Sequence, residues 1–249
     1  MKLVGQKQEK KMTTIAFDVY GTLIDTSGVL DALGNLVGEK ASAFSDIWRN
    51  KQLEYSFRRG LMQNYQPFSV CTHQALNYTC AFLGTNLGLA QKKELMDVYR
   101  VLPAFPDVPK GLAQLQNGGF RLFAFSNGEP EALEALLTHA GIRDLFLGVI
   151  SVDPIRSFKP NPAAYSYFFR QTYSSENAVW LVSSNPFDVI GAISAGMNAA
   201  WIRRSPSAVF DPWGIEPTLT VSDLNQLSPK ILQEVDHLKG RGDPDLACQ

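Results

Sequence analysis

The chain has 249 residues, a length that suits one large domain or two modest ones. Its residues are 45% hydrophobic and 19% charged, which is enough for a sizeable core and is not the composition of a disordered protein. The net charge of -1 gives no general attraction to nucleic acid or to an anionic membrane. No apolar run approaches membrane-spanning length. From the net charge and the absence of such a run, we expect neither a nucleic-acid partner nor a membrane partner.

The two ends of the chain differ from the rest. Residues 1–12 are locally basic and lack an apolar core, so they predict a solvated, disordered tail rather than a signal peptide or anchor. Residues 239–249 predict a second tail. The cysteines, Cys71, Cys80 and Cys248, have no metal-like spacing and are odd in number, which favours reduced thiols in the cytoplasm.

The first structural element expected is a buried strand that begins at Thr14. The run from Thr14 to Phe17 is apolar and partly β-branched, and Asp18 follows it directly, just before a Gly21-Thr22 turn. In an open α/β sheet, ligands bind at the carboxyl ends of the strands. A lone Asp at such a place serves equally well as a turn or helix cap, so Asp18 needs partners before it counts as catalytic.

Residues 27–102 show no convincing strand and several helical stretches, over 41–57, 72–83 and 91–100. We interpret this block as a helical cap inserted over the strand ends. It closes at Pro103, Pro106 and Pro109, which predict a linker.

From there strands and helices alternate, which is typical of a parallel sheet with crossover helices. The expected strands lie at 121–125, 147–152, 179–182, 199–203 and 218–221. The expected helices lie at 129–140, at 162–173 and from the residue after Asn185 through 197, and residues 224–238 form an amphipathic stretch. The prediction is an α/β fold: a Rossmann-like core made of residues 13–26 and 103–238, interrupted by the cap.

Polar residues recur where these strands end. Ser126 and Asn127 follow one strand, Ser183, Asn185 and Asp188 follow another, and Lys159 lies in a loop just before a helix. Each is unremarkable alone, since Ser and Asn also cap helices and Lys is usually solvated. Because the carboxyl ends of parallel strands share one edge, four loops there offer a nucleophile, a cation, hydrogen-bond donors and a second carboxylate.

These segments resemble the four motifs of the haloacid dehalogenase superfamily: Phe17-Asp18-Val19-Tyr20-Gly21-Thr22-Leu23, Ser126-Asn127-Gly128, the Lys159 loop, and Val182-Ser183-Ser184-Asn185-Pro186-Phe187-Asp188. In the cap, the segment from Trp48 to Tyr55 resembles the halide-binding helix of L-2-haloacid dehalogenases. The likeness covers the chain from Thr14 to about Leu238.

Two residues separate this chain from the superfamily's phosphatases, which hold Mg²⁺ with a DxD pair in the first motif and a GDxxxD pair in the fourth. Here Tyr20 and Ser184 stand at positions where two of those carboxylates are expected. The remaining hard oxygen ligands are too few for a good Mg²⁺ site. The resemblance therefore implies hydrolytic dehalogenation of short L-2-haloalkanoic acids to D-2-hydroxy acids, with no metal and no cofactor.

The resemblance also implies the residue roles. Asp18 attacks C2 of the haloacid and forms an ester, Lys159 keeps Asp18 ionised, Arg49 and Asn127 receive the halide, and Asp188 with Asn185 directs the hydrolytic water. The hydrogen-bond shell is completed by Thr22, Ser126, Tyr165 and Ser183, and the apolar substrate wall by Tyr20, Leu53, Phe68 and Phe187. For Leu53 and Phe68, plain core packing is an equally good interpretation.

Three alternatives stay open at the sequence level. A hydrolase of the same scaffold could act on another C2 leaving group or a strained ring, a Mg²⁺-dependent phosphatase could tolerate the missing ligands, and a binding protein could reuse the fold. A homodimer is implied by the resemblance alone. Residue names do not fix the physiological substrate, the chain length or the halide, fluoride included.

Overall fold

The structure, a computed structural model, describes residues 12–175 and 178–240. Almost all of the tail predicted at 1–12 therefore lies outside the described residues, as do residues 241–249. The last helix, α9 (Leu227–Gly240), includes Lys239 and Gly240, so the predicted boundary of the second tail was two residues too early.

The core is a parallel sheet of six strands, ordered β3-β2-β1-β4-β5-β6, which confirms the predicted fold class. The strands are β1 (Thr14–Phe17), β2 (Arg121–Ser126), β3 (Gly148–Ser151), β4 (Val179–Ser183), β5 (Asn198–Ile202) and β6 (Leu219–Val221). Phe17 is in register with Ala124 of β2 and Val182 of β4. The loops that leave these central strands therefore begin at one level, at the carboxyl edge of the sheet.

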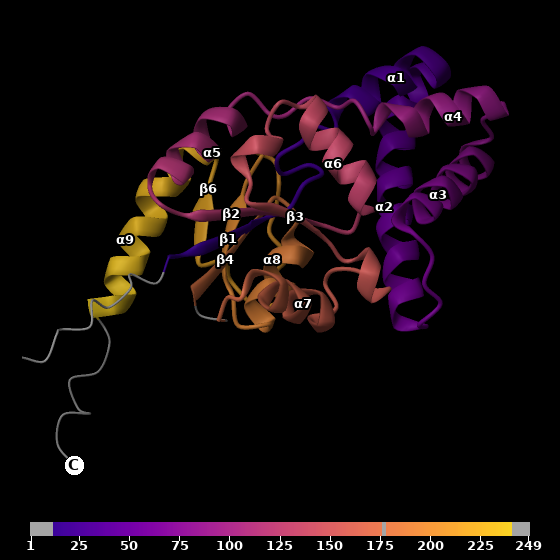
Figure 1. Ribbon diagram of the computed structural model, residues 1–249. Coiled ribbons are helices and arrows are strands. Elements are labelled where there is room, and N and C mark those ends of the chain that lie inside the picture. Colours follow the sequence, from indigo (N-terminus) through magenta and orange to yellow (C-terminus); the bar gives the residue numbers. More distant parts are fainter. Residues whose placement is uncertain (1–11, 176–177, 241–249) are drawn as a thin grey trace, which may run out of the picture.

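Successive side chains of β1 pack into different layers because a strand has a side-chain period of two. Ile15 and Phe17 belong to the larger apolar cluster, and Ala16 belongs to the smaller one on the other face. In Figure 1 the first face is covered by α5 (Val108–Asn117), α6 (Pro130–His139) and α9, and the second by α7 (Pro162–Thr172) and α8 (Pro186–Ser194).

The cap consists of α1 (Ser27–Val37), α2 (Ala41–Leu61), α3 (Phe68–Leu83) and α4 (Leu89–Val98) and lies to one side of the sheet (Figure 1). Trp48 on α2 is buried and its indole nitrogen donates to the Thr72 carbonyl oxygen on α3 at 2.8 Å. Phe44, Leu76 and Leu95 share one buried apolar cluster with the sheet residues. Cap and core are thus joined by continuous packing.

Two helices were not predicted. The residues of α1 were placed in the cap without a helix of their own being predicted there. The start of α5 was predicted to be part of a linker that ends at Pro109, and no helix was predicted after it. Pro109 in fact lies in the first turn of α5, where a missing amide hydrogen costs no helical hydrogen bond. Val108, Leu112 and Leu115 are buried at helical spacing, which is the signal that the prolines obscured. Among the described residues, no helix combines the length and the hydropathy that crossing a bilayer requires.

Candidate active site

Asp18 lies just past β1 and is 7% exposed. Its Oδ2 accepts hydrogen bonds from Thr22 Oγ1 at 2.9 Å, Ser183 Oγ at 3.2 Å and Asn185 Nδ2 at 2.7 Å. Its Oδ1 accepts from Lys159 Nζ at 2.9 Å. Burial alone would raise the pKa of Asp18, but the Lys159 ammonium, the Thr22 hydroxyl and the Arg49 charge bring it below its usual value. The carboxylate is therefore ionised and fixed in orientation.

Lys159 is 1% exposed and bridges two carboxylates. Its Nζ donates to Asp18, to Asp188 Oδ2 at 2.5 Å and to the Phe125 carbonyl oxygen at 3.1 Å. Burial acts to lower the pKa of Lys159, but Asp18 and Asp188 outweigh it and raise that pKa above its usual value. A charged ammonium with three acceptors is the form that this enclosed place stabilises.

Asp188, in the first turn of α8, is fully buried behind Lys159. Its second oxygen, Oδ1, accepts from the Tyr165 hydroxyl at 2.8 Å. Burial raises the pKa of Asp188, with Asp18 adding to the rise and Lys159 opposing it. The two carboxylates on one ammonium are thus shifted in opposite directions.

Ser126 and Asn127 shape the loop after β2. Asn127 Oδ1 accepts from the backbone nitrogen of Lys159 at 2.8 Å, which ties the β2 loop to the lysine loop. Ser126 Oγ accepts from the backbone nitrogen of Gly128 at 3.3 Å. The Asn127 amide nitrogen makes no hydrogen bond to the part of the chain that the structure describes, so it is left available as a donor.

The cap contributes Arg49 from α2. Its Nη1 donates to Gln52 Oε1 at 2.8 Å and its Nη2 to Asn185 Oδ1 at 3.3 Å, so Asn185 links Arg49 to Asp18. Gln52 Nε2 in turn donates to Thr72 Oγ1 at 2.6 Å. Burial lowers the pKa of Arg49, and the nearby Tyr99 and Asp18 oppose that change; a guanidinium stays charged regardless.

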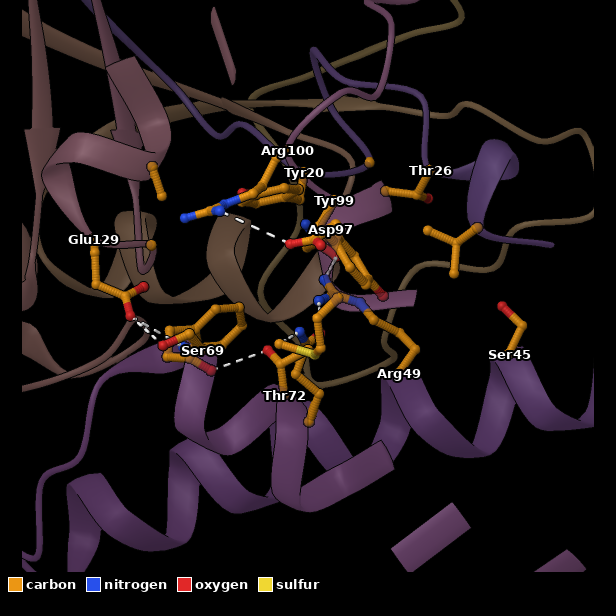
Figure 2. Close-up of a pocket in the computed structure, with 18 of the residues that line it drawn as sticks. Tyr20, Thr26, Ser45, Arg49, Ser69, Thr72, Asp97, Tyr99, Arg100 and Glu129 are labelled. Carbon is orange, nitrogen blue, oxygen red and sulfur yellow. Dashed lines mark hydrogen bonds and ion pairs between the residues drawn. The ribbon is translucent and has the colours of Figure 1, made fainter. Parts of the chain in front are cut away.

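A cavity of about 750 Å³ separates the cap from these strand ends. Figure 2 shows Arg49 extending from α2 toward Tyr99, and Ser69 of α3 reaching Glu129 at the start of α6. The cavity mixes charged, polar and aromatic walls and includes Tyr20, Arg49, Phe68, Tyr99, Glu129 and Asn185. Its volume lies in the range usual for small-molecule sites, about 300–1,000 Å³.

Comparison with known proteins gives one consistent result. Residues 12–196 match the family model of haloacid dehalogenase-like hydrolases. The chain is 37% identical over 210 residues to an (S)-2-haloacid dehalogenase from Pseudomonas sp. (strain YL), covering 84% of this chain and 90% of that protein. It is 39% identical over 212 residues to a haloacetate dehalogenase from Moraxella sp. (strain B), covering 85% and 94%. The chain belongs to the haloacid dehalogenase-like hydrolases, in the branch of the (S)-2-haloacid dehalogenases.

A solved structure agrees with this assignment. The L-2-haloacid dehalogenase of Xanthobacter autotrophicus, solved with chloropropionic acid covalently bound, superposes with a TM-score of 0.83 at 31% identity, over 89% of this chain and 98% of that one. The resemblance inferred from the four motifs and the cap helix is thereby confirmed.

Within this dehalogenase scaffold, the structure brings most of the predicted site residues together. The core residues Asp18, Thr22, Asn127, Lys159, Tyr165, Ser183, Asn185 and Asp188 form one hydrogen-bonded network, with Ser126 beside it. Tyr20, Arg49, Phe68 and Asn185 line the cavity. The predicted substrate residues that do not line it are Leu53, Ser126, Asn127, Tyr165 and Phe187, and Asp18 lies behind Asn185. Phe187 packs against Phe57 instead, with ring centroids 5.2 Å apart.

Sequence reasoning missed several cavity residues, namely Gln52, Ser69, Tyr99, Arg100 and Glu129. Gln52 could have been found, because it stands three residues after Arg49 and so shares its helix face. Tyr99 and Glu129 carried no comparable signal, since only the packing of cap on core brings them to the cavity.

The residues present do not fit the Mg²⁺ of the fold's phosphatases. The Tyr20 ring packs edge-on against Tyr99, with centroids 6.1 Å apart, and offers no carboxylate. Ser184 Oγ donates to the Gly21 carbonyl oxygen at 2.8 Å and so cannot replace an ionised ligand. Within the described residues no three His, Cys, Asp or Glu side chains gather as a metal site. Hard divalent cations prefer sets of several oxygen ligands, which this donor set does not supply.

Proposed function

We propose that the protein hydrolyses the carbon–halogen bond of short (S)-2-haloalkanoic acids and yields (R)-2-hydroxy acids, the D form, without a metal or cofactor. The observation that carries this proposal is the chain of contacts from Asp18 through Asn185 to Arg49, which joins an oriented carboxylate to a cation at the cavity. The relatives named above as (S)-2-haloacid and haloacetate dehalogenases support the substrate class.

In the first step Asp18 acts as the nucleophile. Oδ2 already accepts three hydrogen bonds, whereas Oδ1 accepts one, from Lys159, so Oδ1 keeps a lone pair for attack. That oxygen bonds to C2 from the side opposite the halogen, and the halide leaves with the bonding electron pair. The product is an ester of Asp18, and the configuration at C2 is inverted.

The leaving halide needs positive charge or hydrogen-bond donors, because an enclosed cavity solvates an anion poorly. Arg49 is the proposed cation on the cap side of the cavity. On the core side the proposed donor is the amide nitrogen of Asn127, which makes no hydrogen bond within the described residues. Ser126 and neighbouring backbone amides are assigned to the substrate carboxylate, and Tyr20 and Phe68 to the apolar wall.

In the second step water attacks Cγ of the Asp18 ester, the Cγ–O bond to the substrate breaks, and the 2-hydroxy acid leaves with the original Asp18 oxygen. Asp188 is the proposed base for this water, with Asn185 orienting it. Asp18 is esterified at this stage, and burial raises the pKa of Asp188, which favours its taking a proton from the water.

We also propose that the protein works as a cytoplasmic homodimer joined through its cap. The cap exposes the large apolar side chains Leu61, Met62, Phe82 and Leu89, which solvent alone does not favour. Two of these, Leu61 and Met62, lie at the end of α2, and Phe82 lies near the end of α3. Analytical ultracentrifugation tests the dimer, which a monomer at micromolar concentration would contradict.

The deciding experiment measures halide release from L- and D-2-chloropropionate, with EDTA present, by the wild type and by Asp18→Asn. We expect release from the L form only, and a loss of at least about 10³-fold in the variant, as removal of a nucleophile causes. Asp144→Asn, at an exposed site, is the matched control and should leave the rate unchanged. A single turnover in H₂¹⁸O should place the label on Asp18 and not in the first hydroxy acid. Release that needs Mg²⁺, or survives in Asp18→Asn, would overturn the proposal.

A further inference from the structure

The cap is connected to the core by two stretches of chain, residues 20–26 and 99–107, which we call the connecting segments. They lie side by side and pair in antiparallel fashion at Ile24 and Ala104. The backbone nitrogen of Asp25 donates to the Pro103 carbonyl oxygen at 2.9 Å, and that of Phe105 donates to the Leu23 carbonyl oxygen at 3.0 Å. Any change in the angle between cap and core has to bend both segments.

Arg204, two residues beyond β5, contacts both connecting segments. Its Nη2 and Nε donate to the Thr22 carbonyl oxygen, at 2.6 and 3.2 Å. Its Nη1 donates to both carboxylate oxygens of Asp107, at 2.7 and 2.9 Å, and only 14% of each side chain in this pair is exposed. The guanidinium also lies over the Phe105 ring, 4.1 Å from its centroid.

Asp107 is itself fixed to the core. Its Oδ2 accepts from the backbone nitrogen of Leu224 at 2.6 Å, at the start of the turn that precedes α9. Through Asp107, Arg204 is therefore anchored to the core. It ties the first connecting segment to the end of the second at a point anchored to the C-terminal part of the core.

Thr22 links Arg204 to the nucleophile Asp18, because it contacts both residues. The Thr22 carbonyl oxygen is held by Arg204, while its hydroxyl donates to Asp18 Oδ2 at 2.9 Å and accepts from the backbone nitrogen of Ser184 at 2.9 Å. Gly21, with φ +77°, makes the turn before it. Local backbone hydrogen bonds hold that turn, among them one from the Gly21 nitrogen to the Ile24 oxygen at 2.9 Å and one from the Leu23 nitrogen to the Val19 oxygen at 2.9 Å. The Thr22 carbonyl oxygen takes no part in these local bonds, and Arg204 is the group that holds it.

We propose that Arg204 is a positioning residue: by holding Thr22 and Asp107 together it keeps the Thr22 hydroxyl on Asp18 and keeps the cap, with Arg49, at its working distance from the strand ends. A planar guanidinium is required for this, because it bonds a carbonyl and a carboxylate at once in fixed directions. Lysine could pair with Asp107 but could not also hold Thr22 in the same way. The inference rests on the proposed function for its kinetic consequences only.

The test compares Arg204→Lys and Arg204→Gln with Arg203→Lys, whose side chain is exposed on the adjacent residue. We expect Arg204→Lys to unfold within a few degrees of the wild type, yet to lose about tenfold or more in kcat for L-2-chloropropionate with a smaller change in KM. The acid limb of kcat/KM should move to higher pH, because a displaced Thr22 hydroxyl no longer lowers the pKa of Asp18. Arg203→Lys should match the wild type throughout.

Hydrogen–deuterium exchange gives a second reading that needs no substrate. We expect faster exchange in residues 20–26 and 99–107 of Arg204→Lys, and no change in Arg203→Lys. If the wild type releases no halide but exchange quickens as described, the positioning role stands and the proposed function fails. If Arg204→Lys keeps the wild-type kcat, acid limb and exchange, or if it only lowers the melting temperature, Arg204 is merely structural and the proposal is overturned. Should Arg204→Gln fail to fold, the lysine variant decides alone.

Discussion

The core side and the cap side of the cavity hold their charged groups in different ways. Asp18, Lys159 and Asp188, which we call the core wall, do not line the cavity themselves but lie behind its lining residue Asn185, which donates to Asp18. Each of the three is at most 7% exposed, and hydrogen bonds from several loops fix their charged groups. On the cap wall, Arg49 has one bond within its own helix and one, at 3.3 Å, to the core. The core wall owes its geometry to sheet register, which no small movement alters. The cap wall depends on how the cap sits, so it can adjust to a substrate.

Charge balance gives each wall its task. Two carboxylates against one ammonium leave the core wall with one formal negative charge, and a haloacid brings another. Arg49 is the cavity cation that is linked to this network, through Asn185, and it offsets part of the excess. The cavity is also lined by Arg100 and by the carboxylates of Asp46, Asp97, Glu129 and Glu131. The core wall therefore supplies a fixed nucleophile, and the cap wall supplies the charge that draws the acid in and receives the halide.

The largest effect is expected on the core wall, from Lys159→Met. Removal of the ammonium leaves two buried carboxylates without their shared partner, so the free energy of unfolding should fall by about 3–5 kcal/mol, and halide release should be lost. Urea unfolding measures the first effect. Lys110→Met, at an exposed site on α5, is the control and should stay within about 0.5 kcal/mol of the wild type. Equal urea midpoints for both variants would contradict the view that the core wall is held by Lys159.

On the cap wall, Arg49→Lys should leave stability nearly unchanged, within about 0.5 kcal/mol, and still lower kcat by about 10²-fold. An ammonium cannot donate to Gln52 and Asn185 in the directions of the guanidinium, so the charge meets the halide from the wrong place. Arg58→Lys, on the same helix, faces Glu54 instead and should be silent. A stability loss as large as that of Lys159→Met would remove the distinction between the two walls.

The same contrast explains what could be predicted from the sequence. Asp18, Lys159 and Asp188 are separated by 141 and 29 residues, yet their meeting was predictable because parallel strands bring their carboxyl ends to one edge. Ser183 and Asn185 followed from the same rule, whereas the place of Thr22 in the hydrogen-bond shell was implied by the family resemblance. The catalytic roles of these residues are predictions, which the variants test.

The cap wall followed no such rule. Tyr99 and Glu129 reach the cavity only because α4 and the start of α6 are packed as they are, and Leu53, which shares a helix with Arg49, does not reach it. Gln52 and Leu53 stand three and four residues after Arg49, and both spacings are typical of one helix face, yet only Gln52 lines the cavity. A helix match alone therefore does not say which neighbours face the site. The missed helix α5 had another cause, since Pro109 was taken as a breaker although it occupies a first turn.

The pH dependence of stability tests how well the cap side encloses Tyr99. Burial raises the pKa of Tyr99 to about 12 from its usual 10.0, with Arg49 opposing the rise. Because the folded pKa is the higher one, this contribution to stability is complete below pH 10.0 and is lost as the pH rises toward about 12. Tyr99→Phe should therefore reduce the fall of the urea midpoint across that window. Tyr173→Phe, at a residue 95% exposed, should leave the fall unchanged. Equal curves for both variants would mean that Tyr99 is not enclosed.

The smallest effect is expected from Ser69→Ala, at one of the polar bridges between the cap and the core. Ser69 donates to Glu129 from its hydroxyl, and its backbone nitrogen does so at 3.4 Å, so the variant loses the stronger contact while the backbone one remains. An exposed contact of this kind contributes under about 1 kcal/mol, and the melting temperature should barely move. Cap movement should respond more, because this bridge joins the start of α3 to Glu129, just before α6: KM should rise a few fold, and exchange in α3 should quicken near its start. Ser42→Ala, exposed on α2, controls for loss of a hydroxyl. If Ser69→Ala changed stability but not KM or exchange, the cap wall would be as rigid as the core wall, and its adjustability would have to be given up.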